Sequence, residues 1–384
     1  MSYTQNKARE TGRTHKFSRR TLMKLAAASV LVGCQPDMTT PTQTEKPQPS
    51  PMPTPDTTIP APTSTPTIPP EPTPTTSAVV TPEGEPTVPP SRADITQVYP
   101  AVPSKVIRTH HGAVWANQQL VPEALSQMLD AGISHLTGLD NPGTAWSILF
   151  SPEERVAIKV NTIRGSDYWT HVPLVLAVTE KLKSAGIPPE QIFVFDRYSS
   201  ELESTGYPIN KNPPGIQCLG TDDHFTNGWQ LNGKDLGISD ILLECDALIN
   251  MPVLKNHGMS GLSFALKNHY GTINQPSRFH DNFGICIAEL NALEPIRDRT
   301  RLIIGDELTI VQRSWKAAYP GDSILMSFDP VAHDTAGLQL YEQAAGGGES
   351  AAVRAGAESW LSHAAGIGVG TDDPNHIELV EVAL

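Results

Sequence analysis

Two short polar clusters lie close together in this chain and carry an unusual density of reactive side chains. The first is Lys255-Asn256-His257 and the second is Lys267-Asn268-His269. An apolar, strand-like run from Ala247 to Leu254 precedes the first cluster, and a turn containing glycine and serine separates the two. Amines, amides and imidazoles are seldom fully buried in a protein core, so such a dense group of them is not explained by packing. The pattern therefore predicts a ligand-binding or catalytic site in this stretch.

One chemistry that fits these residues is the binding of an anion. Lysine ammonium groups hold carboxylates and phosphates by charge-assisted hydrogen bonds, and neighbouring amides fix the orientation of the ligand. Lys159 and Asn161 follow another apolar strand and extend the set. We expect catalytic roles for Lys159, Lys255, Lys267 and Asp306, and ligand contacts from Asn161, Asn268 and Asp196.

A second chemistry is the binding of a divalent transition metal. Imidazole and carboxylate suit Zn, Fe or Ni, and the chain offers His257, His269 and His280 as metal ligands, with Asp306 as a carboxylate beside them. An iron–sulfur cluster is not expected, because the cysteines of the globular part show no C-x-x-C spacing. These cysteines are Cys218, Cys245 and Cys286, and they leave room for one disulfide.

The elements that must position these side chains read as alternating strands and helices, which predicts an α/β fold with a doubly wound, mostly parallel sheet. Expected strands are 105–109, 155–160, 191–195, 247–250, 301–305, 323–327 and 377–382, and expected helices are 121–131, 171–185, 285–294 and 332–344. Residues 198–240 are rich in Gly, Asn, Asp and Pro and are expected to form an irregular insertion.

Polar residues follow nearly every predicted strand. They include Lys159 to Asn161, Asp196, Lys255 to His257, Asp306 and Asp329. Because ligands bind beyond the carboxyl ends of parallel strands, we expect these residues to share one rim of the sheet. Lys159, Asn161, Lys255, His257, Lys267, Asn268 and Asp306 are expected to converge in one cleft there.

The N-terminal part of the chain predicts export and anchoring. Ser18-Arg19-Arg20 opens a twin-arginine signal, and a short apolar run then ends at Leu31-Val32-Gly33-Cys34, which resembles a lipoprotein box. Residues 1–34 are therefore expected to be the signal, with Cys34 lipidated at the outer face of the cell membrane or in the periplasm. Residues 35–93 hold 18 of the 35 prolines and are expected to form a disordered Pro/Thr-rich tether. Residues 94–384 are expected to form the α/β domain.

The globular part is acidic. Residues 94–384 contain 34 Asp and Glu against 19 Lys and Arg. Nucleic acid is not expected as a partner, because phosphate-backbone binding requires a basic face. The expected partners are the membrane, through Cys34, and a small anion or metal ion.

Three blocks of sequence resemble a known family. They are Val156 to Asn161, the central block Asp246 to Ile273 with its Pro, Lys-x-His and Leu-Lys-Asn elements, and Asp329-Pro-Val-Ala-His-Asp334. Together they resemble the family of domain of unknown function 362, over roughly residues 105–345. The resemblance implies an α/β domain and names no reaction. Many family members carry ferredoxin-type cysteine clusters, which imply redox or metal chemistry, and this chain lacks them.

Two functions from different classes fit the sequence. One is an exported, membrane-tethered enzyme that uses a metal ion or an anionic cofactor or substrate at the carboxyl ends of the strands. The other is a lipoprotein that binds a solute and hands it to a membrane partner without catalysis. The presence of general acid–base groups distinguishes the two functions, and Asp306, Glu307 and Asp334 are candidates for this role. One metal ion per chain, found by elemental analysis, would favour the enzyme.

Overall fold

The computed structural model describes residues 89–163, 168–311, 318–345 and 347–384. The predicted signal, Cys34 and nearly all of the predicted tether therefore lie outside the described residues. Within the described residues, no helix combines the length and the apolar character needed to cross a membrane.

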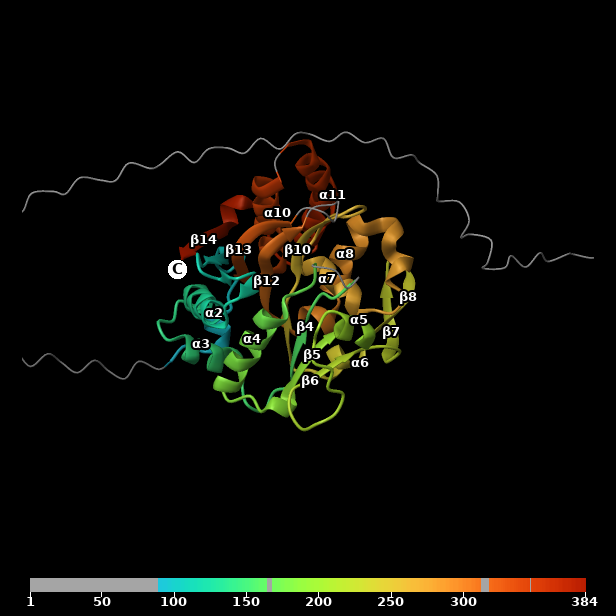
Figure 1. Ribbon diagram of the computed structural model, residues 1–384. Coiled ribbons are helices and arrows are strands. Elements are labelled where there is room, and N and C mark those ends of the chain that lie inside the picture. Colours follow the sequence, from blue (N-terminus) through green and yellow to red (C-terminus); the bar gives the residue numbers. More distant parts are fainter. Residues whose placement is uncertain (1–88, 164–167, 312–317, 346) are drawn as a thin grey trace, which may run out of the picture. The chain divides into compact units, whose positions relative to one another are not determined.

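A ten-stranded sheet forms the centre of the described domain (Figure 1). Its main path runs in the order β14-β1-β13-β12-β9-β4-β5-β6, while β10 pairs with β12 and β11 pairs with β10. The strands are β1 (Ser104–His110), β4 (Val156–Lys159), β5 (Ile192–Asp196), β6 (Gln217–Gly220), β9 (Ala247–Asn250), β10 (Val253–His257), β11 (Gly261–Ser263), β12 (Thr300–Val311), β13 (Ala318–Ser327) and β14 (Ile377–Ala383). Two separate hairpins are β2 (Trp115–Ala116) with β3 (Gln119–Leu120) and β7 (Phe225–Leu231) with β8 (Lys234–Ser239).

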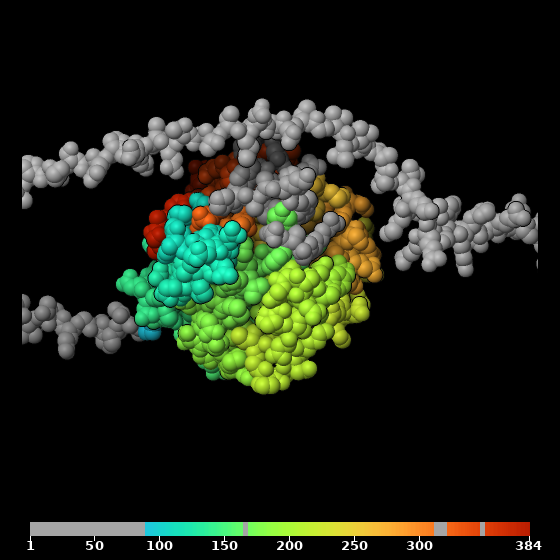
Figure 2. Space-filling view, viewed as in Figure 1, coloured from blue at the N-terminus to red at the C-terminus, as the bar shows by residue number. Residues whose placement is uncertain are grey.

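Helices cover both faces of the sheet, as a doubly wound fold requires. The α-helices are α1 (Arg92–Ile95), α2 (Pro122–Thr137), α3 (Pro142–Leu149), α4 (Val172–Ser184), α5 (Ser199–Ser204), α6 (Asp240–Glu244), α7 (Ala265–Asn268), α8 (Phe283–Ala292), α9 (Glu294–Arg297), α10 (Pro330–Ala345) and α11 (Gly347–Gly366). Short 3₁₀ helices span Pro189–Gln191, His269–Thr272, Pro276–Asn282 and Pro374–His376. Helices α2, α3 and α4 line one core, and α8, α10 and α11 line the other. In the space-filling view, α2 and α3 (blue-green) and the region of α5 and β6 (yellow-green) form much of one face (Figure 2).

The two cores follow from side-chain alternation along the strands. In β4, Val156 and Ile158 point into the core beneath α2 to α4, whereas Ala157 points into the opposite core. Successive side chains of a strand face opposite sides, so a strand that is apolar throughout must be covered on both. Helix α2 begins with Pro122, which has no amide hydrogen to leave unsatisfied, and ends at Gly138 in the left-handed conformation.

The fold class predicted from the sequence is confirmed: the domain is α/β with a mostly parallel sheet flanked by helices. Two details differ from the expectation. Strand β13 runs antiparallel to both of its neighbours, β1 and β12. Residues 198–240 also contain more regular structure than expected, since β6 adds a parallel strand next to β5 and β7 with β8 forms a hairpin.

The direction of β13 corrects one part of the predicted rim. Because β13 is antiparallel to β12, its carboxyl end lies at the opposite edge of the sheet from the ends of β4, β5 and β9. Asp329 accordingly accepts a hydrogen bond from the hydroxyl of Ser104, the first residue of β1, at 2.7 Å. Asp329 is therefore part of the far edge and not of the candidate site.

Candidate functional site

Three neighbouring parallel strands end in polar residues that meet at one edge of the sheet. Lys159 ends β4, Asp196 ends β5 and Asn250 ends β9. Lys159 lies opposite Asn250 in the register of β4 with β9. All three residues are buried, so their hydrogen bonds have to be supplied by the protein.

Lys159 uses all of its hydrogen-bonding capacity inside the protein. Its ammonium group donates to Oδ1 of Asp196 at 2.7 Å, to the carbonyl of Val160 at 2.6 Å and to Oδ1 of Asn268 at 3.4 Å. A lysine ammonium has three N–H groups, and these contacts account for all of them. Lys159 is therefore placed to organise the site and has no N–H left for a ligand.

Asp196 is saturated in the same way. Oδ1 accepts from Lys159 and from the amide of Arg197, and Oδ2 accepts from both the amide and the hydroxyl of Thr162, at 2.7 and 2.8 Å. A carboxylate offers about four lone-pair positions, and all are occupied. Asp196 therefore ties the end of β5 to the loop after β4 and leaves no lone pair for a ligand or metal.

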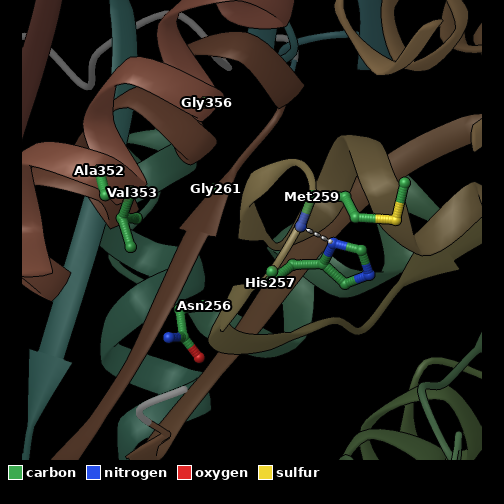
Figure 3. Close-up of a pocket in the computed structure, with 8 residues that line it drawn as sticks. Asn256, His257, Met259, Gly261, Ala352, Val353 and Gly356 are labelled. Atoms are coloured by element: carbon green, nitrogen blue, oxygen red, sulfur yellow. Dashed lines mark hydrogen bonds between the residues drawn. The ribbon is translucent and has the colours of Figure 1, made fainter. Parts of the chain in front are cut away.

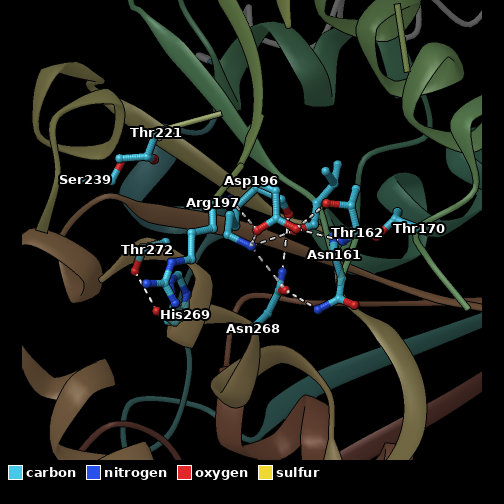
Figure 4. Close-up of polar contacts among 12 residues, drawn as sticks. Asn161, Thr162, Thr170, Asp196, Arg197, Thr221, Ser239, Asn268, His269 and Thr272 are labelled. Carbon is cyan, nitrogen blue, oxygen red and sulfur yellow. Dashed lines mark hydrogen bonds and ion pairs between the residues drawn. The ribbon is translucent and has the colours of Figure 1, made fainter. Parts of the chain in front are cut away.

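A directional row of amides runs through the site, and Figure 4 shows its first contact, between Asn161 and Asn268. Asn161 Nδ2 donates to Asn268 Oδ1 at 3.1 Å, and Asn268 Nδ2 donates to Asn250 Oδ1 at 2.7 Å. Asn250 Nδ2 continues to Nε2 of His269 at 3.3 Å. The lysines set the direction of the row: a lysine only donates, so the amide oxygens of Asn161 and Asn268 face Lys255 and Lys159, respectively.

Lys255 is the residue whose environment departs most from that of an ordinary lysine. It lies within β10, is 3% exposed, and donates to Oδ1 of Asn161 at 2.6 Å and to the carbonyl of Tyr168 at 3.3 Å. Among the described residues, no carboxylate oxygen lies within ion-pair distance of its ammonium group. Burial lowers the pKa of Lys255 to about 7, and the positive charge of Lys267 acts in the same direction.

The position of Lys255 differs from the sequence expectation, which placed it beyond the end of a strand. Pro252 interrupts the apolar run, so β9 ends at Asn250 and the chain restarts as β10 alongside β12. Lys255 therefore belongs to an inner strand. It still reaches Asn161, because the side chain extends from β10 across to the loop that follows β4.

Lys267 lies on the short helix α7 and is half-buried. Its Nζ lies 5.1 Å from the ring centre of Tyr270 and 5.4 Å from that of Phe283, which is a cation–π arrangement. Burial lowers the pKa of Lys267 to about 8. Asp334 of α10 holds α7 in place by accepting the amides of Ala265 and Leu266 at 2.8 and 2.9 Å.

Asp306 has a different partner from the one that the sequence suggested. It lies in the middle of β12, and its Oδ2 accepts from both the amide and Nδ1 of His171, each at 2.8 Å. Burial on its own would lower the pKa of His171, but the charge and hydrogen bond of Asp306 raise it. The carboxylate of Asp306 therefore pairs with the imidazole of His171 at the start of α4 and favours its protonated form. Among the described residues, Asp306 makes no contact with the lysines.

Two of the three predicted histidine ligands pack against the same aromatic ring, and the third is buried. The ring of His257 lies edge-on to Phe283 at 5.6 Å, and that of His280 lies 4.9 Å from the same phenylalanine. His269 is buried, and burial lowers its pKa to about 3, which keeps it neutral. Within the described residues, no three His, Cys, Asp or Glu side chains gather in a way that could hold a metal ion.

None of the lysines of the site lines either of two cavities in the described part of the chain. One of about 90 Å³ is lined by the β10–β11 hairpin and α11, including His257, Met259 and Val353 (Figure 3). Gly261 permits this packing, since a Cβ there would lie 2.2 Å from the carbonyl oxygen of Val353. Another, of about 130 Å³, is mostly apolar and lies between α4 and Cys218.

The cysteines of the domain are unpaired. Cys218, Cys245 and Cys286 are all buried and free. Burial raises the pKa of Cys218 and that of Cys245 to about 12. Thiols with such pKa values are inert at neutral pH, so these two cysteines pack in the core.

Sequence reasoning missed two members of this region. His171 falls at the start of an expected helix and Asn250 at the end of an expected strand, and neither is among the residues expected in the site. A polar residue that ends a fully buried strand must find a hydrogen-bond partner, and this signal could have identified Asn250. No comparable signal in the sequence linked His171 to Asp306.

A comparison with models of protein families matches the part of the chain that contains the site. Residues 156–339 match the model of the family described as domain of unknown function (DUF362), which confirms the resemblance over that stretch. It contains all the lysines and asparagines of the site. A search of curated proteins finds no match.

Two solved structures resemble part of the chain. One is a protein from Thermotoga maritima, with 13% identity and a TM-score of 0.36, covering 59% of this chain and 58% of that one. The other is the lactate racemase apoprotein from Thermoanaerobacterium thermosaccharolyticum, with 15% identity and a TM-score of 0.36, covering 65% of this chain. The present chain spans 58% of each of these proteins.

Proposed function

We propose that this protein is an enzyme that binds a small anionic molecule at the ends of β4, β5 and β9 and uses Lys255 as a proton acceptor. The observation that carries the proposal is the environment of Lys255. Its amine is buried, is held by the amide oxygen of Asn161 at 2.6 Å, and has no carboxylate within ion-pair distance among the described residues. An amine with a pKa of about 7 is partly neutral at physiological pH, and a general base works best when its pKa lies near the working pH.

Hydrogen-bond accounting separates the residues that build the site from those that are available to a ligand. Lys159, Asp196 and Asn268 use their donors and acceptors on one another and on neighbouring groups. Lys255 retains one N–H, and Asn161 retains one N–H of its amide within the described structure. The ammonium of Lys267 faces aromatic rings and has no hydrogen-bond acceptor among the described residues. An anion would accept from these groups.

An anionic ligand fits this donor set better than a divalent metal ion does. A metal ion would be repelled by the lysines, and the nearest carboxylate, Asp196, has no free lone pair. Metal ions in proteins need deprotonated or neutral ligands with open lone pairs. We therefore assign the anion as the ligand of this cluster.

We also propose that the protein is exported by the twin-arginine route and anchored through lipid on Cys34. The support is the sequence Ser18-Arg19-Arg20, the apolar run that ends at Cys34, and the proline-rich stretch 35–93. In this arrangement the domain works at the outer face of the cell membrane or in the periplasm, at the end of a long tether.

Competitive acetylation tests the role of Lys255. The full chain is treated with trace acetic anhydride between pH 5 and pH 10, and the labelling of Lys255 is read by peptide mass spectrometry against exposed Lys183. We expect half-maximal reactivity of Lys255 near pH 7 and protection by sulfate. A midpoint near the ordinary lysine value of about 10.4, without protection, would overturn the proposal.

The alternative function is solute binding without catalysis. It is favoured by Lys267, whose ammonium group lies over the rings of Tyr270 and Phe283. This charged group holds an anion without any transfer of a proton. A Lys255→Arg variant distinguishes the two functions, because arginine keeps the positive charge but cannot accept a proton at neutral pH. Retained anion binding with lost turnover indicates an enzyme, whereas retained anion binding with no turnover in either the variant or the wild type indicates a binding protein.

A further inference from the structure

Among the residues that the structure describes, the charges around the amide row do not balance. The charges of Lys159 and Lys267 act on Lys255, as does that of Asp196. Glu201, Arg197 and Lys159 form a neighbouring set of charges around the same carboxylate, Asp196. Asp306 lies nearby but is already committed to His171. Asp281 acts on His280 next to Lys267, but it is exposed and therefore screened by water.

The two carboxylates each have a specific cation. Asp196 accepts directly from Lys159 at 2.7 Å. Glu201 lies within electrostatic reach of Arg197, which acts on it as a favourable charge. Once these two pairs are removed from the count, Lys255 and Lys267 remain, and neither has a carboxylate within ion-pair distance among the described residues.

The two remaining lysines are linked through the amide row. Lys255 donates to Asn161, and Asn161 donates to Asn268, the residue that follows Lys267. The charge of Lys267 acts on Lys255, so the two ammonium groups repel when both are protonated. Two like charges that are held together in a buried place are costly unless an opposite charge compensates them. Lys267 and Asn161 are only partly buried, which gives a ligand a way to reach them from solvent.

We propose that the ligand of this site is a small dianion, a dicarboxylate or a phosphate monoester, whose two negative charges are matched by Lys267 and by the ammonium form of Lys255. The free protein holds Lys255 in both forms: the ammonium form pairs with the dianion, and the neutral form is the one that accepts a proton. This inference rests on the proposed function and narrows it to a substrate class. The amide hydrogen of Asn161 that is left over donates to one of the ligand oxygens and sets its orientation.

Isothermal titration of the full chain at constant ionic strength tests the proposal with two matched pairs of probes. The first pair is malonate and monomethyl malonate, and the second is methyl phosphate and dimethyl phosphate. At about pH 7.5, above the second pKa of a phosphate monoester, which is about 6, the first member of each pair is mostly a dianion and the second a monoanion of similar shape. We expect the dianion to bind on the order of 10- to 100-fold more tightly, which is the effect of one additional charged hydrogen bond.

Variants locate the second charge. Lys267→Met should reduce the preference for the dianion to less than about threefold, while Lys183→Met, which removes an exposed lysine paired with Glu180, should leave it intact. Lys255→Met should have the same effect as Lys267→Met. If Lys255→Met does not fold, Lys267→Met decides alone, because Lys267 is half-buried on a short helix.

Each outcome has a distinct meaning. Equal binding of monoanion and dianion to the wild-type protein overturns the two-charge proposal and leaves the anion site standing. Failure of all four probes to bind overturns both the dianion proposal and the proposed anion site. A dianion preference that survives Lys267→Met overturns the assignment to this lysine pair. A preference seen in only one probe pair identifies the ligand as a dicarboxylate or as a phosphate monoester.

Discussion

The Nζ atom of Lys255 lies 2.6 Å from Oδ1 of Asn161, so a lysine of β10 donates directly to an amide in the loop after β4. This contact joins two segments that are far apart in the sequence. It also orients the Asn161 amide, whose nitrogen must then point at Asn268. The row of amides and the lysines therefore form one network, and a change at either end of it affects the other.

The first prediction concerns the pH dependence of stability. The folded-state pKa of Lys255 is about 7, well below the unfolded value of about 10.4. The unfolded state therefore binds more protons between those two pH values, and stability rises with pH across that window. Below pH 7 the cost of the buried charge is fully present. Lys255→Met removes this cost, so the unfolding free energy of the variant should exceed that of the wild type most at low pH.

Urea denaturation at pH 6, 7, 8 and 9 checks this. The difference in unfolding free energy between Lys255→Met and wild type should shrink by about 2 kcal/mol between pH 7 and pH 9, since one pH unit corresponds to at most about 1.4 kcal/mol. Lys183→Met serves as the control and should follow the wild-type profile. Parallel profiles for Lys255→Met and wild type would show that Lys255 titrates as an ordinary lysine.

The second prediction concerns Asn268. Its amide oxygen accepts from Asn161 and Lys159, and its nitrogen donates to Asn250. Asn268→Ala leaves these buried groups without a partner, so we expect a loss of roughly 2–4 kcal/mol in unfolding free energy. Asn375→Ala, at an exposed position, should change it by less than about 0.5 kcal/mol. Similar losses in the two variants would contradict the network.

How far the sequence predicted this site can be seen from particular residues. Lys159 and Asp196 each end a short apolar run, and in parallel strands such ends must meet at one edge. The pairing of Asp306 with His171 was not predictable. The sequence pattern places the end of a strand just before Asp306, whereas β12 continues to Val311 and leaves Asp306 in its middle. The direction of β13 was also invisible, since an apolar run has the same pattern in either orientation.

The third prediction concerns the membrane anchor. Cys34→Ser removes the only residue at which the proposed lipidation takes place, so most of the protein should move from the membrane fraction to the soluble fraction in the host that exports it. The domain itself should keep its melting temperature. Cys286→Ser, a change within the domain, is the control and should stay with the membrane. An unchanged membrane fraction for Cys34→Ser would refute lipid anchoring at this residue.

The fourth prediction concerns Gly271, which packs against the ion pair of Lys159 with Asp196. A Cβ at this position would lie 2.6 Å both from Nζ of Lys159 and from Oδ1 of Asp196. Gly271→Ala should therefore push the pair apart and cost about 1–3 kcal/mol, as overpacking of a well-packed interior does. Gly112→Ala is the matched control, because no atom lies within 4 Å of its Cβ position. Thermal and urea denaturation measure the unfolding free energy of both variants. Equal values for Gly271→Ala and Gly112→Ala would show that the ion pair has room to shift.

The last prediction concerns the pairing of His171 with Asp306. The carboxylate raises the pKa of His171 despite the burial of the ring, so the protonated imidazole is stabilised in the folded protein. A folded-state pKa above the unfolded value adds stability that is complete below about pH 6.5 and is lost as the pH rises through the folded-state pKa. Asp306→Asn removes this contribution, together with a pH-independent part from the two backbone amides that Asp306 accepts. The deficit of Asp306→Asn in unfolding free energy should therefore be larger at pH 5.5 than at pH 9. An NMR titration of the His171 ring should show a lower pKa in the variant, while Asp298→Asn, at an exposed carboxylate paired with Arg297, should leave it unchanged. A pKa of His171 that is the same with and without the carboxylate would mean that this pair only positions the start of α4.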